Sequence, residues 1–287
     1  MNAYRLVRRS RCAMAALIAG AAFPLVSPAL AGSGANVVVY NHHMAEQGEK
    51  EINLLSDFGN PGNGGAKYFA QLIEFEYGVT GRWTTALYFE GDKIDGENYA
   101  FGGWRFENRV RVFAGDVFLN PVLYAEYEES RPAHRFKRAV TGRTDGGGDD
   151  EGGVTEHEVE TKLILGQDIN DRLDVSFNWI NEANLDSGNW AFGYAAGLNY
   201  VVFETGGGKG GRGWDLKEVK LGVEFYGGLG DSDKGLTFDG SKTEQYAGVN
   251  LKGELANGVQ LGIGGAFGLT DDSQDSIVRT SIGYEFK

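Results

Sequence analysis

Apolar and polar residues alternate with a period of two along most of the chain. In the run 245–255, for example, Val249 and Leu251 share one face, while Asn250 and Lys252 fall on the other. This period is typical of a β-strand with one apolar and one polar face, whereas an amphipathic helix repeats about every 3.6 residues. The pattern therefore predicts an all-β protein.

Twelve such runs follow one another, separated by connections rich in turn residues such as Asn257-Gly258, a strong signal for a β-hairpin. Most runs have the about 9–11 residues that a tilted transmembrane strand needs, or more. Pro61 and Pro132 lie in connections and Pro121 begins a run, so none removes a hydrogen bond inside a strand. We therefore predict strands at 49–58, 66–79, 83–91, 98–113, 120–130, 156–169, 172–183, 189–203, 215–227, 243–256, 258–269 and 276–286.

The connections between the predicted strands alternate in length. Counted from the N-terminus, the second, sixth and tenth are tight turns, and the fourth (114–119) is also short. The odd-numbered connections include the two longest, 131–155 and 228–242. Short turns on one side and longer loops on the other are the layout of outer-membrane barrels, which would place both chain ends in the periplasm. The eighth connection (204–214), long and glycine-rich, departs from this layout.

A soluble β-sandwich would show the same alternation, but three features favour a membrane barrel. Aromatic residues such as Trp83, Trp190, Tyr284 and Phe286 lie near strand ends, as interfacial girdles require. Many predicted strands are longer than the about 5–6 residues usual in soluble proteins. The polar faces contain many glycines, which suit a crowded lumen. We expect residues 49–287 to form one antiparallel transmembrane β-barrel of about 12 strands.

The first residues of the chain differ from the rest. Four arginines precede an uncharged, largely apolar stretch (13–26), and residues 29–31 (Ala-Leu-Ala) match a small-x-small cleavage site, so residues 1–31 are predicted to be a secretory signal peptide. The apolar stretch is short against the about 20 residues of a membrane-spanning helix. Cys12 is the only cysteine, which excludes disulfides and cysteine ligands in the mature chain. Residues 32–48 would form a periplasmic arm or a plug in the lumen.

The last predicted strand resembles that of outer-membrane barrel proteins, in which alternating apolar residues end in an aromatic that the barrel-assembly machinery reads. Val278, Ile282, Tyr284 and Phe286 match this pattern, and Lys287 departs from it by adding one residue. The resemblance implies an outer-membrane location and the assembly machinery as a partner, and it brings no activity with it. Three further segments are similar to those of uncharacterised proteobacterial exported barrel proteins: 41–44 (Asn-His-His-Met), 74–79 (Glu-Phe-Glu-Tyr-Gly-Val) and 83–85 (Trp-Thr-Thr).

Removal of the signal peptide would leave 23 basic and 40 acidic residues, a net charge of −17. Such a chain should not bind nucleic acids, whose phosphates require a basic surface. The acidic stretch Asp145–Glu151 lies in the longest connection, where it could bind divalent cations that bridge lipopolysaccharide. Such stretches are more often solvated, mobile loops. Outer-membrane lipid and lipopolysaccharide are therefore the expected surroundings.

Charged residues gather on the polar faces of neighbouring predicted strands. These faces must point inward, because an arginine that faces lipid at the midplane costs about 2–4 kcal/mol. Opposite charges on adjacent strands can then pair, either as a constriction that selects solutes by charge or as a salt-bridge network that fills the lumen. We favour the network, because barrels of ~8 strands are packed, those of ~16 are open, and twelve lies between. The residues are Arg105, Glu107, Arg109, Arg111, Glu74, Glu76, Glu90, Glu126 and Glu128.

No cofactor, metal or catalytic site is expected. Adjacent residues of an extended chain point in opposite directions, so His42 and His43 should rarely reach one metal ion. The glycines of 206–211 match GxGxxG, but no helix follows to hold a phosphate. A lipid-acting enzyme would need a histidine and a serine together on the outer wall. His157 should face outward, but no serine partner can be assigned to it from spacing.

The sequence thus predicts a narrow pore or uptake barrel for small solutes, lined by the charged residues of the polar faces. A closed structural or adhesive barrel, whose acidic outer loops contact partners, is the second hypothesis. A barrel enzyme acting on lipids is the third.

Overall fold

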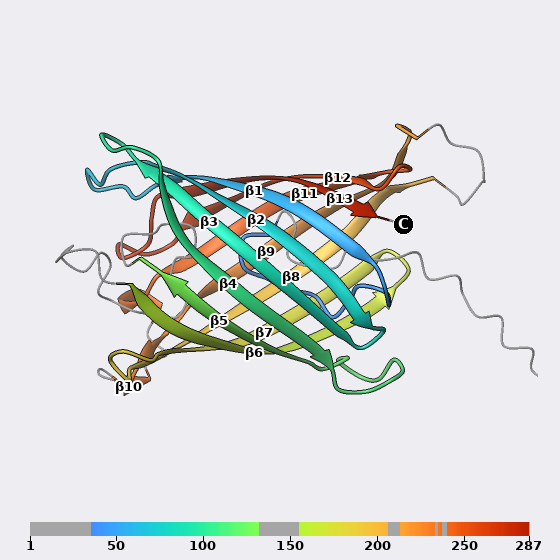
Figure 1. Cartoon of the computed structure of the whole chain (residues 1–287), viewed down its shortest axis with the longest axis horizontal. Coiled ribbons are helices and arrows are strands. Elements are labelled where there is room, and N and C mark those ends of the chain that lie inside the picture. The colour runs from blue at the N-terminus through green and yellow to red at the C-terminus, as the bar shows by residue number, and fades with distance from the viewer. Residues whose placement is uncertain (1–35, 132–154, 206–212, 233–234, 237–239, 287) are drawn as a thin grey trace, which may run out of the picture.

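The computed structural model describes residues 36–131, 155–205, 213–232, 235–236 and 240–286 (Figure 1). The strands are β1 (Lys50–Asn60), β2 (Tyr68–Thr80), β3 (Trp83–Ile94), β4 (Ala100–Arg111), β5 (Val122–Ser130), β6 (Glu156–Asn170), β7 (Leu173–Asn184), β8 (Trp190–Glu204), β9 (Leu216–Asp231), β10 (Gly235–Leu236), β11 (Gln245–Leu255), β12 (Val259–Gly268) and β13 (Ser276–Phe286). Neighbouring strands are antiparallel, and the sheet closes because β1 pairs with β13 and β8 pairs with β9. A closed barrel leaves no strand edge to face lipid with unpaired backbone groups.

The predicted fold class is confirmed, and the twelve long strands match the predicted ones to within a few residues at most ends. The two-residue β10, which pairs with the end of β9, was not predicted. β9 continues to Asp231 instead of ending at residue 227, because its last residues pair with both β8 and β10. The acidic stretch Asp145–Glu151 and the glycines of 206–211 lie outside the described residues.

The fourth connection spans 112–121 and is longer than the predicted 114–119. It folds against the end of β6: the backbone N–H of Gly166 donates to the carbonyl of Leu119 at 2.8 Å. The backbone N–H of Leu119 in turn donates to the side chain of Gln167 at 3.0 Å. These contacts join residues distant in sequence, so the local pattern of residue types could not reveal them.

Apolar side chains cover the outside of the barrel, and polar ones cover its inside. In β2, Ile73, Phe75 and Tyr77 are exposed, while Glu74 and Glu76 between them are buried. This arrangement suits a barrel whose outer face contacts lipid, because a charged side chain in contact with lipid destabilises the fold. No helix within the described part of the chain is long and apolar enough to cross a membrane.

Exposed aromatic residues lie near both ends of the barrel. Trp83 begins β3 and Trp190 begins β8, at opposite ends, while Tyr284 and Phe286 close β13. Such aromatics are typical of the membrane–water interfaces. Lys50 pairs with Phe286, so the start of β1 and the C-terminus lie at the same end, together with the β2–β3 turn (Figure 1).

A charge placed on the outer wall tests this orientation. Ile263 lies at the middle of β12 and is 53 % exposed. We expect Ile263→Arg to reduce the free energy of unfolding from lipid vesicles by about 2–4 kcal/mol, since the arginine would face hydrocarbon. Asp271→Arg, in the connection between β12 and β13, is the matched control and should change stability little. Equal effects of the two variants in a urea titration would contradict the orientation.

Candidate functional site

The N-terminal segment (residues 36–48) enters the inside of the barrel (Figure 1): residues 36–45 are buried or partly buried there, and residues 46–48 are exposed. Val39 is fully buried and belongs to an apolar cluster, against which Val37 and Val38 also pack. The other members come from six strands: Ile180, Ala195, Tyr226, Tyr246, Ala266 and Ile277. The segment therefore completes an apolar core inside an otherwise polar lumen.

Glu224 on β9 holds the backbone of this segment. Its carboxylate accepts hydrogen bonds from the backbone N–H groups of Val37 at 2.7 Å, Val38 at 3.1 Å and Val39 at 3.3 Å. Each buried N–H group left without a partner would cost about 1–3 kcal/mol. A single side chain thus satisfies three consecutive donors of a segment that pairs with no strand along this stretch.

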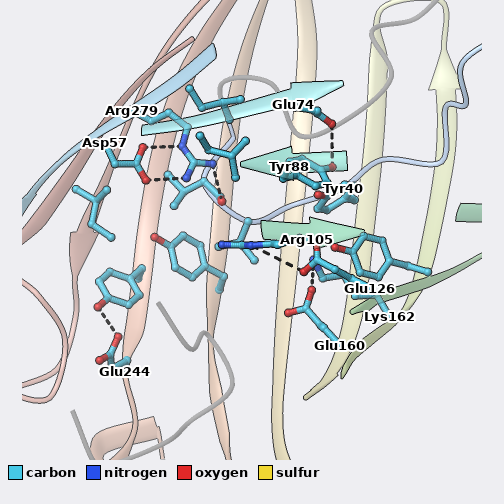
Figure 2. Close-up of a pocket in the computed structure, with 18 residues that line it drawn as sticks. Tyr40, Asp57, Glu74, Tyr88, Arg105, Glu126, Glu160, Lys162, Glu244 and Arg279 are labelled. Atoms are coloured by element: carbon cyan, nitrogen blue, oxygen red, sulfur yellow. Dashed lines mark hydrogen bonds and ion pairs between the residues drawn. The ribbon is translucent and has the colours of Figure 1, made fainter. Parts of the chain in front are cut away.

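Arg279 on β13 binds the same stretch from another side. Its Nε and Nη2 donate to the two carboxylate oxygens of Asp57 on β1, each at 2.7 Å (Figure 2). Its Nη1 donates to the carbonyl oxygens of Asn36 and Val37, each at 2.9 Å. Bidentate guanidinium–carboxylate pairs are among the strongest hydrogen-bonded pairs in proteins. Arg279 thereby links two strands of the wall to the N-terminal segment.

Tyr40 contacts strands β4, β5 and β7, on another part of the wall than Arg279 and Asp57. Its N–H and carbonyl exchange hydrogen bonds with the side-chain amide of Asn178 on β7, at 2.7 and 2.9 Å. Its hydroxyl donates to Glu107 at 3.0 Å, and its ring meets Tyr124 edge-on, with ring centroids 5.2 Å apart. The Nζ of Lys162 lies 4.3 Å from both ring centroids, within the range of a cation–π contact.

Two inward-facing glycines leave room for the N-terminal segment. A Cβ on Gly78 would collide with the backbone of Glu46, and a Cβ on Gly166 would collide with the ring of His42. The backbone of Gly78 also exchanges hydrogen bonds with Gly48 and Glu49, at 2.7 and 3.0 Å. The wall is thus shaped for this segment at both positions.

Eight of the nine residues predicted to line the lumen are buried inside the barrel, and Arg111 is partly buried. Arg105 pairs with Glu90, and its guanidinium lies 3.8 Å from Glu126 and 3.6 Å from Glu128. These carboxylates come from β3 and β5, the two neighbours of β4. The carboxylates of the adjacent strands therefore compensate the charge of Arg105, because a buried charge without a partner would be strongly destabilising.

Arg109 forms the second centre of this network. It pairs with Glu76 of β2, and its Nε lies 2.8 Å from Glu107 of its own strand. The hydroxyl of Tyr88 lies 2.8 Å from Glu74 and 2.7 Å from Glu107, which joins β2, β3 and β4. Together with the contacts of Arg105, they form ion pairs and hydrogen bonds along the inner face of β2 to β5. A role in selecting solutes by charge stays a prediction.

Arg111 lies apart from this network, near the end of β4. Its Nη2 donates to the carbonyl of His42 at 3.1 Å, and its Nη1 lies 3.9 Å from Asp116. Its contact is thus with the N-terminal segment instead of with the carboxylates of the neighbouring strands.

The expectation that His42 and His43 point in opposite directions is wrong. The Nε2 atoms of both lie near the carboxylate of Asp168 on β6, at 3.4 and 3.3 Å, and the two ring centroids are 4.2 Å apart. The reason is local: the chain bends here, and the side chain of Asn41 accepts a hydrogen bond from the N–H of His43 at 3.0 Å. Alternation of side chains holds only for an extended chain.

Sequence reasoning missed Asp57, Asn178, Glu224 and Arg279, which hold the N-terminal segment. In the sequence, these four residues cannot be distinguished from the other polar residues that face the lumen. One signal was present, because Ile180 and Ile277 fall on the polar faces of β7 and β13. An isoleucine that faces the lumen indicates an apolar partner inside it.

Residues of the N-terminal segment and of the wall line a small cavity inside the barrel. The cavity has a volume of about 90 Å³, with Arg279 and Asp57 at one side and Tyr40, Glu126 and Lys162 at the other (Figure 2). It has room for several water molecules. Sites for small organic molecules commonly have about 300–1,000 Å³. This cavity is therefore too small for such a solute.

His157 lies on the outer wall, as predicted, and its partner is an acid. Its Nδ1 is 3.2 Å from Asp186, and its backbone N–H donates to the same carboxylate at 2.8 Å. This backbone hydrogen bond lowers the pKa of Asp186 below its usual value. Within the described residues, no hydrogen bond joins His157 to Ser187, whose hydroxyl donates to Asn184. Ser187 is therefore not the partner of His157 in this structure.

The barrel has counterparts among solved structures. An outer membrane channel from Pseudomonas putida F1 aligns with a TM-score of 0.51 and 13% sequence identity, over 85% of this chain and 97% of that chain. The translocator domain of the autotransporter NalP from Neisseria meningitidis aligns with a TM-score of 0.50 and 15% identity, over 85% and 90%. The chain has the fold of outer-membrane β-barrel proteins. At these identities the similarity shows the fold alone.

No protein-family model and no curated protein matches the sequence. The expected resemblance to outer-membrane barrel proteins is confirmed by the structural alignments and not by sequence similarity.

Filling the space at Gly166 should expel the N-terminal segment. We expect Gly166→Val to let chymotrypsin cleave after Tyr40 in the folded barrel, whereas the wild-type bond should resist, because Tyr40 is held inside. Gly115→Val is the matched control, since a Cβ there meets nothing within 4 Å. Equal protection of Tyr40 in the Gly166→Val variant and the control would contradict the close fit.

Removal of the buried cation Arg279 should destabilise the barrel. We expect Arg279→Met to lower the free energy of unfolding by about 3–5 kcal/mol, because Asp57 and Glu224 would stay buried without their cation. The double variant Arg279→Met/Asp57→Leu should recover much of this loss, since an apolar pair replaces an ion pair. Urea titrations of the barrel in vesicles measure both. A loss of under about 1 kcal/mol in the single variant, the value of an exposed pair, would contradict the buried position of Arg279.

Proposed function

We propose that this protein is an outer-membrane channel for small solutes whose lumen is closed by its own N-terminal segment. The observation that carries this proposal is the position of residues 36–45, which lie inside the barrel and contact seven of its strands or more. Opening would require the segment to leave the lumen or to shift within it. Solutes would then pass the ion pairs of Arg105 and Arg109, which would act as the charged constriction.

The kind of contact supports a displaceable plug. Much of the backbone of residues 36–40 is bound by polar side chains, such as Glu224, Asn178 and Arg279, and not by a strand ladder. Water can replace such partners when the segment leaves, so the wall groups need not remain unsatisfied. A segment paired as a strand of the sheet could not leave without opening the barrel.

We propose that the barrel lies in the outer membrane, on the basis of its apolar outer face, of residues 1–31 and of β13. We propose that residues 1–31 direct export, that β13 with Tyr284 and Phe286 is read by the barrel-assembly machinery, and that lipid and lipopolysaccharide surround the wall. The exposed aromatics at both ends of the barrel support this placement.

A closed structural barrel is the second candidate. The ion pairs of Arg105 and Arg109 favour it, because they occupy part of the lumen, and the cavity beside them is too small for an organic solute. The two candidates differ in one respect: a channel conducts when the N-terminal segment is displaced, and a structural barrel does not.

Conductance across planar bilayers separates them. We expect a variant that lacks residues 32–46 to conduct steadily, and the intact mature chain to show only brief openings. A folded deletion variant that stays silent would contradict the channel and favour the structural barrel. Migration on a gel before and after boiling serves as the check of folding.

A disulfide can fix the segment in place as a reversible control. A Cβ on Gly197 would lie 3.4 Å from the Cβ of Val39, close to the about 3.5–4.5 Å that a disulfide needs. In Val39→Cys/Gly197→Cys, oxidation should abolish the brief openings and reduction should restore them. Cys12 lies in the predicted signal peptide and would not interfere. Openings that persist after complete oxidation would contradict the role of the segment.

A further inference from the structure

Three potential metal ligands meet where the N-terminal segment passes β6. They are His42 and His43 of the segment and Asp168 of the strand, and their ligand atoms lie within 4.8 Å of one another. His42 is buried, while the side chain of His43 is 16% exposed and that of Asp168 is 50% exposed. The cluster is therefore held by the protein on one side and open to solvent on the other, as a site that exchanges an ion with solution requires.

The separations are those of ligands around one ion. The Nε2 atoms of His42 and His43 lie 3.4 and 3.3 Å from different oxygens of the Asp168 carboxylate. Charge-assisted hydrogen bonds between such groups are shorter, at about 2.7–2.9 Å. Two donors bound to one zinc ion at about 2.0–2.1 Å in a tetrahedron lie about 3.3–3.4 Å apart. The geometry fits an ion between the three groups better than direct hydrogen bonds.

The protein fixes both histidines from outside the cluster. The turn at Asn41 brings their rings to the same side of the chain, and Arg111 holds the carbonyl of His42. The positive charge of Arg111 lies next to Asp116, which offsets part of its repulsion for a cation. Gly166 leaves the space that the ring of His42 fills.

We propose that His42, His43 and Asp168 bind a divalent transition-metal ion such as Zn²⁺, with one coordination position left for water. Two imidazoles and a carboxylate are ligands that Zn²⁺ and its neighbours accept, whereas Ca²⁺ and Mg²⁺ prefer oxygen ligands. The ion would join the N-terminal segment to the barrel wall at the end of β6. This site does not depend on channel activity, so it stands or falls separately from the proposed function.

Calorimetric titration tests the proposal directly. The mature chain, without a polyhistidine tag and freed of metal by a chelator, is folded in detergent and titrated with Zn²⁺ and then with Ca²⁺. We expect one Zn²⁺ per chain and no Ca²⁺ at the same concentrations. His43→Ala and Asp168→Asn should each weaken Zn²⁺ binding by more than the about 10- to 100-fold that loss of an outer-shell partner costs.

His157→Ala is the matched control, because His157 also lies beside an aspartate but, among the residues that the structure describes, forms no contact with a second histidine. This variant should bind Zn²⁺ as the wild type does. Absence of Zn²⁺ uptake, uptake unchanged in both His43→Ala and Asp168→Asn, or loss of uptake in His157→Ala would each overturn the proposal.

The visible spectrum of bound Co²⁺ gives a second measurement that needs no variant. Tetrahedral Co²⁺ absorbs far more strongly than octahedral Co²⁺, so the wild-type protein should develop an intense band that saturates at one ion per chain. Zn²⁺ should then abolish the band by displacing Co²⁺. A weak octahedral spectrum, or no spectrum, would overturn the tetrahedral site even if a variant failed to fold.

Discussion

The carboxylate of Glu224 accepts hydrogen bonds from three consecutive backbone N–H groups, and the position of the N-terminal segment inside the barrel depends on this interaction. Val37, Val38 and Val39 pair with no strand along this stretch, so a polar side chain of the wall must satisfy their donors. Arg279 then binds the carbonyls of the same stretch and the carboxylate of Asp57. The charged groups inside the barrel thus hold a piece of backbone in the middle of the lumen.

The same requirement, that every buried charged or polar group has a partner, explains the rest of the interior. Lipid forces the ionic side chains inward, and each buried cation must find carboxylates there. Arg105 and Arg109 find them on the adjacent strands, while Arg279 divides its donors between Asp57 and the N-terminal segment. Among the described residues, three apolar clusters are buried, and the largest of them surrounds Val39. Charge pairing and a small apolar core together fill the barrel.

The sequence predicts the wall well because its information is local. Alternation with period two places Glu74, Arg105 and Arg109 inside and Ile263 outside without any knowledge of the fold. The filling of the lumen is different, since Glu224 and Val37 are 187 residues apart and no period connects them. The turn at Asn41, which brings two histidines to one side, is a local feature, but the assumption of an extended chain hid it.

Hydrogen–deuterium exchange at the backbone of residues 37–40 tests the central claim most directly. If Glu224 and Asn178 bind these N–H groups in a lumen closed to solvent, they should exchange many times more slowly than in an unfolded peptide. The same groups should exchange quickly in Glu224→Ala/Asn178→Ala, while the strand amides of the barrel stay protected. Exchange of residues 37–40 at the unfolded rate in the wild-type barrel would contradict the account.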